Sequence, residues 1–90
     1  MLDKIRAALR LNNKEFDSEI NDLINSAKND LLLAGITDDD KKPLISRAIE
    51  IYCKANFGLD NADSEKYAEA YQKLKDHLAI SEDYACISKK

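Results

Sequence analysis

The chain has 90 residues, of which 44% are hydrophobic and 34% are charged, and its formal net charge is −3. This length fits one domain, and the acidic balance argues against a dedicated nucleic-acid binder, which needs clustered Lys and Arg to displace phosphate counterions. No stretch approaches the roughly 20 apolar residues of a membrane span, and Asp3, Lys4 and Arg6 interrupt the apolar core that a signal peptide needs. We therefore expect a cytoplasmic protein whose two cysteines are reduced.

The apolar residues Leu2, Ile5 and Leu9 recur at helical spacing and predict a first helix from Leu2 to about Arg10. A helix this short is marginal in isolation, so packing must hold it. Arg6 and Arg10 lie one turn apart on the opposite side of this helix. Two interpretations stay open: they contact a phosphate backbone or an acidic partner, or they are solvated charges on a short helix.

After a polar turn, a second helix is predicted over residues 16–34, with Asp17 as a candidate N-cap and Gly35 as the stop signal. Leu32 and Leu33 lie outside its apolar stripe, and either pack under the following loop or contact another chain. The stripe itself has the width expected of a surface helix and comprises Phe16, Ile20, Leu23, Ile24, Ala27 and Leu31.

The loop that follows carries three consecutive acids, Asp38, Asp39 and Asp40. It lacks the alternating oxygen ligands and the closing Glu of a calcium loop. Acids are favoured close to a helix N-terminus by the helix macrodipole. We therefore expect this run to serve the next helix and solubility rather than a metal.

Residues 43–58 are predicted to form the central helix of the domain. Pro43 suits the first helical turn and Gly58 the left-handed residue that ends a helix, while Glu50 and Lys54 have the spacing of a favourable exposed ion pair. The apolar arc covers more than half of the circumference, and it comprises Leu44, Ile45, Ala48, Ile49, Ile51, Tyr52, Cys53 and Ala55. A surface helix needs a stripe only about 100° wide, so this one must be covered from more than one side.

A fourth helix is predicted to begin at Asn61 or Asp63 and to end near Ala79. Its narrow apolar stripe comprises Tyr67, Ala70, Tyr71, Leu74 and Leu78. Residues 80–90 lose helical periodicity and are expected to form a flexible tail. The sequence thus predicts an all-α fold: a small, mostly antiparallel four-helix bundle over residues 1–79, with a central apolar helix and a flexible C-terminal tail over residues 80–90.

No group of residues indicates catalysis, a cofactor or a metal. His77 lies beside the apolar stripe of the last helix, with no nucleophile or second acid–base group placed against it by the sequence. Cys53 falls on the apolar arc of the central helix, and its distance from Cys86 along the chain matches no zinc-ligand pattern. We therefore interpret the chain as a non-enzymatic helical interaction module.

The order of several segments resembles the small head-tail connector proteins, also described as phage DNA-packaging proteins, of tailed phages and prophages of low-GC Gram-positive bacteria. The segments are LDKIRAALRL (2–11), FDSEINDLI (16–24), AK (27–28), GI (35–36), PLI (43–45), AI (48–49), YCKANFG (52–58), Tyr71, Leu74 and HL (77–78). Each segment alone is only a helix-packing pattern, and their joint order over residues 2–84 gives the resemblance its specificity.

The resemblance implies a ring of identical helical subunits, a dodecamer, docked beneath the portal protein at one capsid vertex. Such a ring extends the channel through which DNA passes without specific binding, and it presents a platform for the next head-completion or tail protein. Family precedent allows a monomer in solution. The resemblance also implies assembly in the host cytoplasm and a final location in the virion neck. From the residues themselves we expect no cofactor and no membrane contact.

A closed ring needs two different complementary surfaces on each subunit. Leu32 and Leu33 are candidates for one of them, and exposed parts of the first or last helix for the other. The end of the chain continues past the usual end of the family, whose members use flexible termini to engage the portal. Residues 80–90 are therefore expected either to add to the portal as an extended segment, with Ile80, Tyr84 and Ile87 as candidate contacts, or to have no role.

Two other functions remain alternatives. One is a small bacterial helical adaptor or regulatory protein that binds a partner protein through one groove. The other is a helical nucleic-acid-binding module, which the acidic balance disfavours.

Overall fold

The computed structural model describes residues 1–57 and 63–85. These residues form four α-helices and one 3₁₀ turn: α1 (Leu2–Ala8), α2 (Asp17–Leu33), α3 (Pro43–Asn56), α4 (Ser64–Ala79) and η1 (Glu82–Tyr84). Within the described ranges there is no strand, only an isolated antiparallel bridge between Ile36 and Ala85. Gly58, the predicted end of the central helix, lies outside the described residues.

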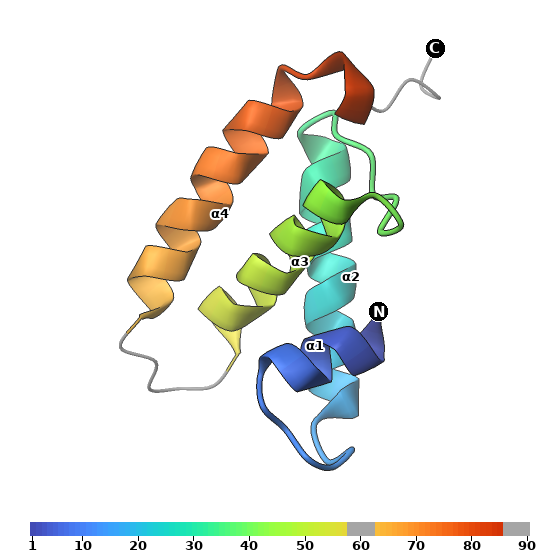
Figure 1. The fold of residues 1–90 in the computed structure, drawn as a ribbon, viewed down its shortest axis with the longest axis vertical. Helices are drawn as coiled ribbons and strands as arrows, with labels where there is room; N and C mark the ends of the chain where they lie inside the picture. Colours follow the sequence, from blue (N-terminus) through green and yellow to red (C-terminus); the bar gives the residue numbers. More distant parts are fainter. Residues whose placement is uncertain (58–62, 86–90) are drawn as a thin grey trace.

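Helix α3 lies between α2 and α4 and runs antiparallel to both, while the short α1 crosses the beginning of α2 (Figure 1). α3 contacts each of the other three helices. The predicted all-α bundle with a central helix is therefore confirmed, and α4 packs mainly on α3 rather than on α2.

The core gathers around the apolar arc of α3. Ile45, Ile49 and Cys53 are fully buried, and the other helices and the loop after α2 contribute Ile5, Ile20, Ile24, Ala27, Leu31, Ile36, Tyr71 and Leu78. The arc is covered less completely than its width predicts, since Leu44 remains 38% exposed. Two long neighbours bury two sides of α3, and the seven-residue α1 is too short to cover the remaining side.

Helix α2 ends as Gly35 predicts. Gly35 adopts a φ of 81°, its N–H donates to the Leu32 carbonyl at 3.0 Å, and the Ile36 N–H donates to the Leu31 carbonyl at 2.9 Å. This pair of bonds is a Schellman motif, and the burial of both Leu31 and Ile36 supplies the apolar contact that accompanies it.

The beginnings of the helices follow the sequence with one exception. Pro43 is the first residue of α3, and Asp63 directly precedes α4, both as predicted. The prediction of Asp17 as N-cap is wrong, because Phe16 holds that position and Asp17 is already helical. The Asp17 carboxylate instead accepts two hydrogen bonds from the Arg6 guanidinium, at 3.0 and 2.9 Å.

Helix α1 is shorter than predicted and ends with the same motif on an unusual residue. Arg10 has a φ of 62°, its N–H donates to the Ala7 carbonyl, and the Leu11 N–H donates to the Arg6 carbonyl, both at 3.0 Å. A side chain in this left-handed region carries a backbone strain that glycine does not.

Replacing Arg10 by Gly should raise the free energy of unfolding by about 0.5–1 kcal/mol, because glycine adopts the left-handed region without a steric penalty. Urea denaturation of the two proteins measures the difference. Arg10→Ala is the control, since it removes the guanidinium and keeps the strain. Equal stabilisation by both changes would show that charge, and not backbone conformation, is responsible.

Candidate assembly surfaces

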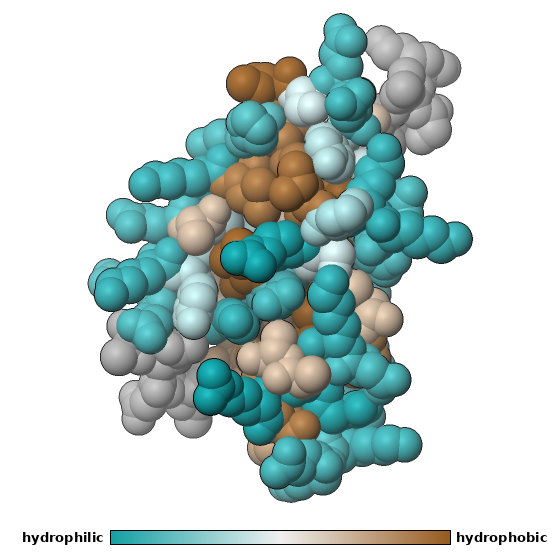
Figure 2. Space-filling model, viewed as in Figure 1, coloured by the Kyte–Doolittle hydropathy of each residue, from teal (hydrophilic) through white to brown (hydrophobic). Residues whose placement is uncertain are grey.

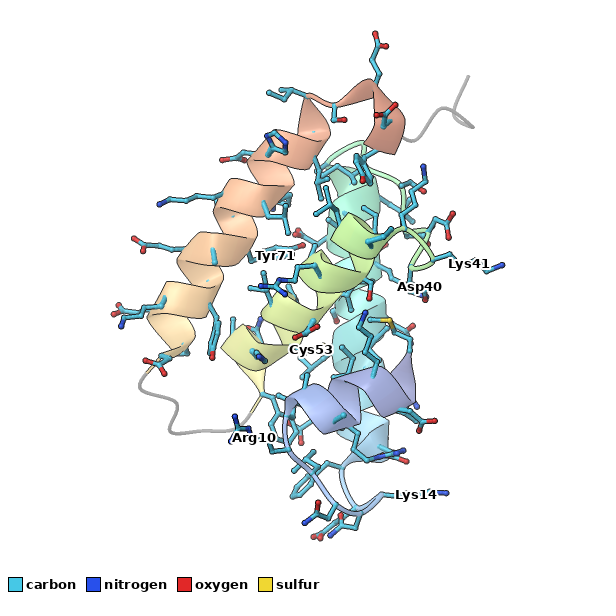
Figure 3. The ribbon with its side chains drawn as sticks, in the orientation of Figure 1. Arg10, Lys14, Asp40, Lys41, Cys53 and Tyr71 are labelled. Atoms are coloured by element: carbon cyan, nitrogen blue, oxygen red, sulfur yellow. The ribbon has the colours of Figure 1, made fainter. Side chains whose placement is uncertain are left out.

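The two arginines predicted to share one side of the first helix have different environments. The Arg6 guanidinium is half-buried and ion-paired with Asp3 and Asp17, each at 2.9 Å, and its hydrogen bond to Asp17 raises its pKa. It therefore joins α1 to α2 within the fold. Arg10 lies beyond the end of α1 and is exposed, and the exposed Lys14 points away from the body of the molecule (Figure 3).

Leu32 and Leu33 also differ in their exposure to solvent. Leu32 is half-buried, whereas Leu33 is 81% exposed. Of the two interpretations, packing under the following loop is wrong for Leu33, because Gly35 turns the chain so that Ile36, not Leu33, enters the core. The interpretation of Leu33 as a contact with another chain remains a proposal.

A second exposed aliphatic residue lies at the same end of the molecule. Ile80, directly after α4, is 84% exposed, and the C-terminal ends of α2 and α4 point in the same direction (Figure 1). We call the five exposed residues at these two helix ends the apolar end: Leu33, Ala34, Gly35, Ala79 and Ile80, which the exposed acids Glu82 and Asp83 of η1 follow. Monomeric surfaces tolerate single exposed aliphatic residues, and two large ones at one end of the molecule make this end a candidate contact surface.

The chain after Ile80 differs from the flexible tail that the sequence predicts. The Tyr84 carbonyl accepts a hydrogen bond from the Thr37 N–H at 2.8 Å, and Lys42 Nζ donates to the Asp83 carbonyl at 3.0 Å. Lys42 Nζ also lies 5.3 Å from the centre of the Tyr84 ring. Residues 81–85 thus dock on the loop after α2, whose backbone donors the helices leave free. Ile87 and Cys86 lie outside the described residues.

A polar cluster joins α2 to α4. The Tyr71 hydroxyl donates to Asp30 Oδ2 at 2.6 Å, and Lys75 Nζ donates to the same oxygen at 3.0 Å; Figure 3 shows Tyr71 pointing from α4 toward the other helices. The hydrogen bond from Tyr71 and the charge of Lys75 lower the pKa of Asp30. Burial and the neighbouring carboxylate raise the pKa of Tyr71, so the hydroxyl stays protonated.

The described surface shows no arrangement for catalysis. His77 is exposed on α4, and burial raises the pKa of the Cys53 thiol to about 12, which keeps it unreactive at neutral pH. Among the residues described, no group of three His, Cys, Asp or Glu side chains is placed to hold a metal. An open hollow on the outer face of α4 is lined by Glu65, Lys66, Ala68, Glu69 and Gln72, without converging acid–base groups.

Sequence reasoning missed the contacts that join distant segments, namely Arg6 with Asp17, Tyr71 with Asp30, and Lys42 with Tyr84. Helical periodicity identifies which residues share a face, but it does not pair a residue on one helix with a residue on another. The i,i+4 pair of Glu50 and Lys54 was found, at 3.7 Å, because both residues lie on one helix.

Asp30→Asn keeps an oxygen acceptor for Tyr71 and removes the negative charge. The loss of the ionic contact with Lys75 should lower the free energy of unfolding at neutral pH. The decrease should be about 1 kcal/mol or less, because solvent screens this partly exposed carboxylate. The folded-state pKa of Asp30 lies below its unfolded value of about 3.9. The advantage of wild type is therefore complete above the unfolded pKa and disappears as the pH falls through the folded pKa.

Urea denaturation over a series of acidic pH values measures this difference between the proteins. Asp76→Asn is the matched control, because the exposed Asp76 accepts a hydrogen bond from Gln72 on its own helix. A wild-type advantage that persists unchanged at the lowest pH would contradict an ionic origin.

Comparison with known families adds one match. Residues 1–85 match the family described as phage connector protein. The matched range contains all four helices and the docked residues 81–85. Neither a curated protein nor a solved structure matches the chain. Of the helices described, none combines the length and apolar character required to cross a membrane.

Proposed function

The chain belongs to the phage connector protein family, and we propose that it is a head-completion protein that forms a ring under the portal of a tailed phage or prophage. Membership gives it a structural, connector-type role among the head and tail proteins of the virion neck, not an enzymatic one. The match over nearly the whole chain is the observation that carries this conclusion, and it favours a virion protein over a bacterial adaptor.

The ring extends the DNA channel and joins head to tail. Its partners are the portal protein on one side and the next head-completion or tail protein on the other, and the family suggests a dodecamer that assembles in the host cytoplasm. The isolated protein is monomeric under this proposal and closes into a ring on the portal. Duplex DNA passes through the channel without specific binding, in keeping with the net charge of −3.

The apolar end supports self-association or portal contact. A ring with rotational symmetry joins unlike surfaces of neighbouring subunits, and exposed aliphatic side chains supply the water-excluding centre of such contacts. Leu33 and Ile80 are the two most exposed large aliphatic residues of the described chain. We assign them to one side of the subunit contact, and exposed parts of α1 with the neighbouring Arg10, or of α4 away from its outer face, to the other.

Leu33→Asp should abolish ring formation on the portal without unfolding the subunit, because it places a charge in the contact while Leu33 adds nothing to the core. Negative-stain images of the purified protein mixed with portal test this, and circular dichroism verifies the fold. Leu32 is left intact because it is half-buried. Ala68→Asp adds the same charge on the outer face of α4 and should leave rings intact. Rings formed by Leu33→Asp as readily as by wild type would contradict the assignment.

We propose that the C-terminal segment, residues 80–90, engages the portal. Two truncated chains, one ending after the docked residues 81–85 and one ending before them, separate the role of these residues from that of the rest of the segment. A chain ending at Ala85 keeps the contacts of Tyr84 with Thr37 and Lys42, whereas a chain ending at Ala79 loses them. We expect the chain ending at Ala79 to bind the portal at least about tenfold more weakly than the full chain. Co-sedimentation with portal measures this, and equal binding by all three chains would show that the segment has no role.

A further inference from the structure

One exposed surface of α2 carries uncharged amide and hydroxyl side chains instead of the charged residues common elsewhere in this chain. At 100° per residue these residues fall within an arc of about 140°. We call them the amide face: Ser18, Asn21, Asn25, Ser26 and Asn29, all exposed. Two exposed charged residues of α2 lie in its first half, and both are acids: Asp22 falls within this arc, and Glu19 falls just beyond its edge.

The charged residues in the second half of α2 are held in ion pairs to other segments. Lys28 Nζ lies 3.0 Å from Asp40, a contact that lowers the pKa of Asp40, and Asp30 pairs with Lys75 at 3.0 Å. Lys28 is the only cation of α2 and is half-buried. The whole length of α2 therefore presents no exposed cation.

The outer face of α4 has the opposite composition. Its exposed residues include Glu65, Lys66, Glu69, Lys73 and Asp76, and Figure 2 shows hydrophilic side chains along this edge of the molecule. Since α3 lies between α2 and α4 (Figure 1), the outward faces of the two helices point to different sides of the subunit. One side of the subunit thus carries exposed charges of both signs, and the other carries mainly uncharged side chains, two acids and no exposed cation.

The amide face also differs from a protein–protein contact. Such contacts are centred on aromatic, Met and Arg side chains and are depleted in Ser, and the amide face contains none of these anchors. Its amides and hydroxyls retain water well, so the face is suited to stay hydrated in an assembly.

A hydrated surface without cations has a particular effect on duplex DNA. Lys and Arg side chains release counterions from the phosphates and so hold DNA tightly. Asn and Ser form hydrogen bonds to phosphates or to bridging water without that release, and a densely acidic wall would repel the duplex. The amide face has no cation and a single acid, Asp22, within its arc, so it neither holds nor strongly repels the duplex.

We propose that the amide face of α2 lines the channel of the ring, and that duplex DNA moves along it without being held. This inference rests on the proposed function, and it orients each subunit with α2 toward the axis and the charged face of α4 toward the outside.

Two matched pairs of substitutions test the orientation in assembled particles of the phage that encodes the chain. Asn25→Lys/Asn29→Lys adds two cations one turn apart on the amide face. Ala68→Lys/Gln72→Lys adds two cations at the same spacing on the outer face of α4, where both residues are exposed. Lys is a better helix former than Asn, so the first pair should fold, and circular dichroism verifies this. DNA released from a particle passes along the channel wall, so a change in its release rate between these variants reports on the lining.

We expect both variants to enter particles, and only the α2 variant to slow DNA release, by at least about tenfold at low salt with recovery at high salt. Release at the wild-type rate by the α2 variant, or slower release by the α4 variant, would overturn the inference. Failure of the α2 variant to enter particles that accept the α4 variant would make the amide face a protein contact and also overturn it. If the wild-type protein itself is missing from purified particles, the proposed function fails and the orientation with it.

Discussion

The burial of the apolar arc of α3 is the constraint on which the other elements depend. Ile45, Ile49 and Cys53 are fully buried, and removing such side chains from water contributes about 1.5–3 kcal/mol for each large aliphatic residue. A single partner helix does not cover an arc this wide, so both α2 and α4 must pack against α3, and α1 adds a third, short contact. The antiparallel order of the three long helices follows from their short connections.

This arrangement determines which surfaces remain for assembly. α2 and α4 each bury one face against α3. Their outward faces and their ends therefore remain available for contact with other molecules. The C-terminal ends of both helices lie together, and residues 81–85 connect them by docking on the loop after α2. The result is a subunit with an apolar end, a charged outer face on α4 and an amide face on α2, and these unlike surfaces suit a ring whose subunits meet through different sides.

The helices were predictable from sequence because periodicity, Pro43 and Gly35 each act locally, within a few residues. The left-handed backbone conformation of Arg10 was not predictable, since a residue other than glycine in that conformation has no local sequence signal. The ion pair of Arg6 with Asp17 and the cluster around Asp30 were missed because they join separate helices. The 3₁₀ turn at Glu82–Tyr84 was not predictable either, because three residues are too few to show a helical period in the sequence. Leu33 was a candidate contact because it falls outside the apolar stripe, and Ile80 because it begins the C-terminal segment that the resemblance relates to the portal. The amide face becomes recognisable only once the burial of α2 is known.

The most direct test of the whole account is a reconstruction of the neck of purified particles at a resolution that traces helices. The account predicts a closed ring of these subunits against the portal, each with α3 enclosed by its own α2 and α4 and with the apolar end in contact with a neighbouring protein. A neck with no density that fits this four-helix subunit, or a ring in which α3 leaves its own bundle to pack on another copy, would contradict it.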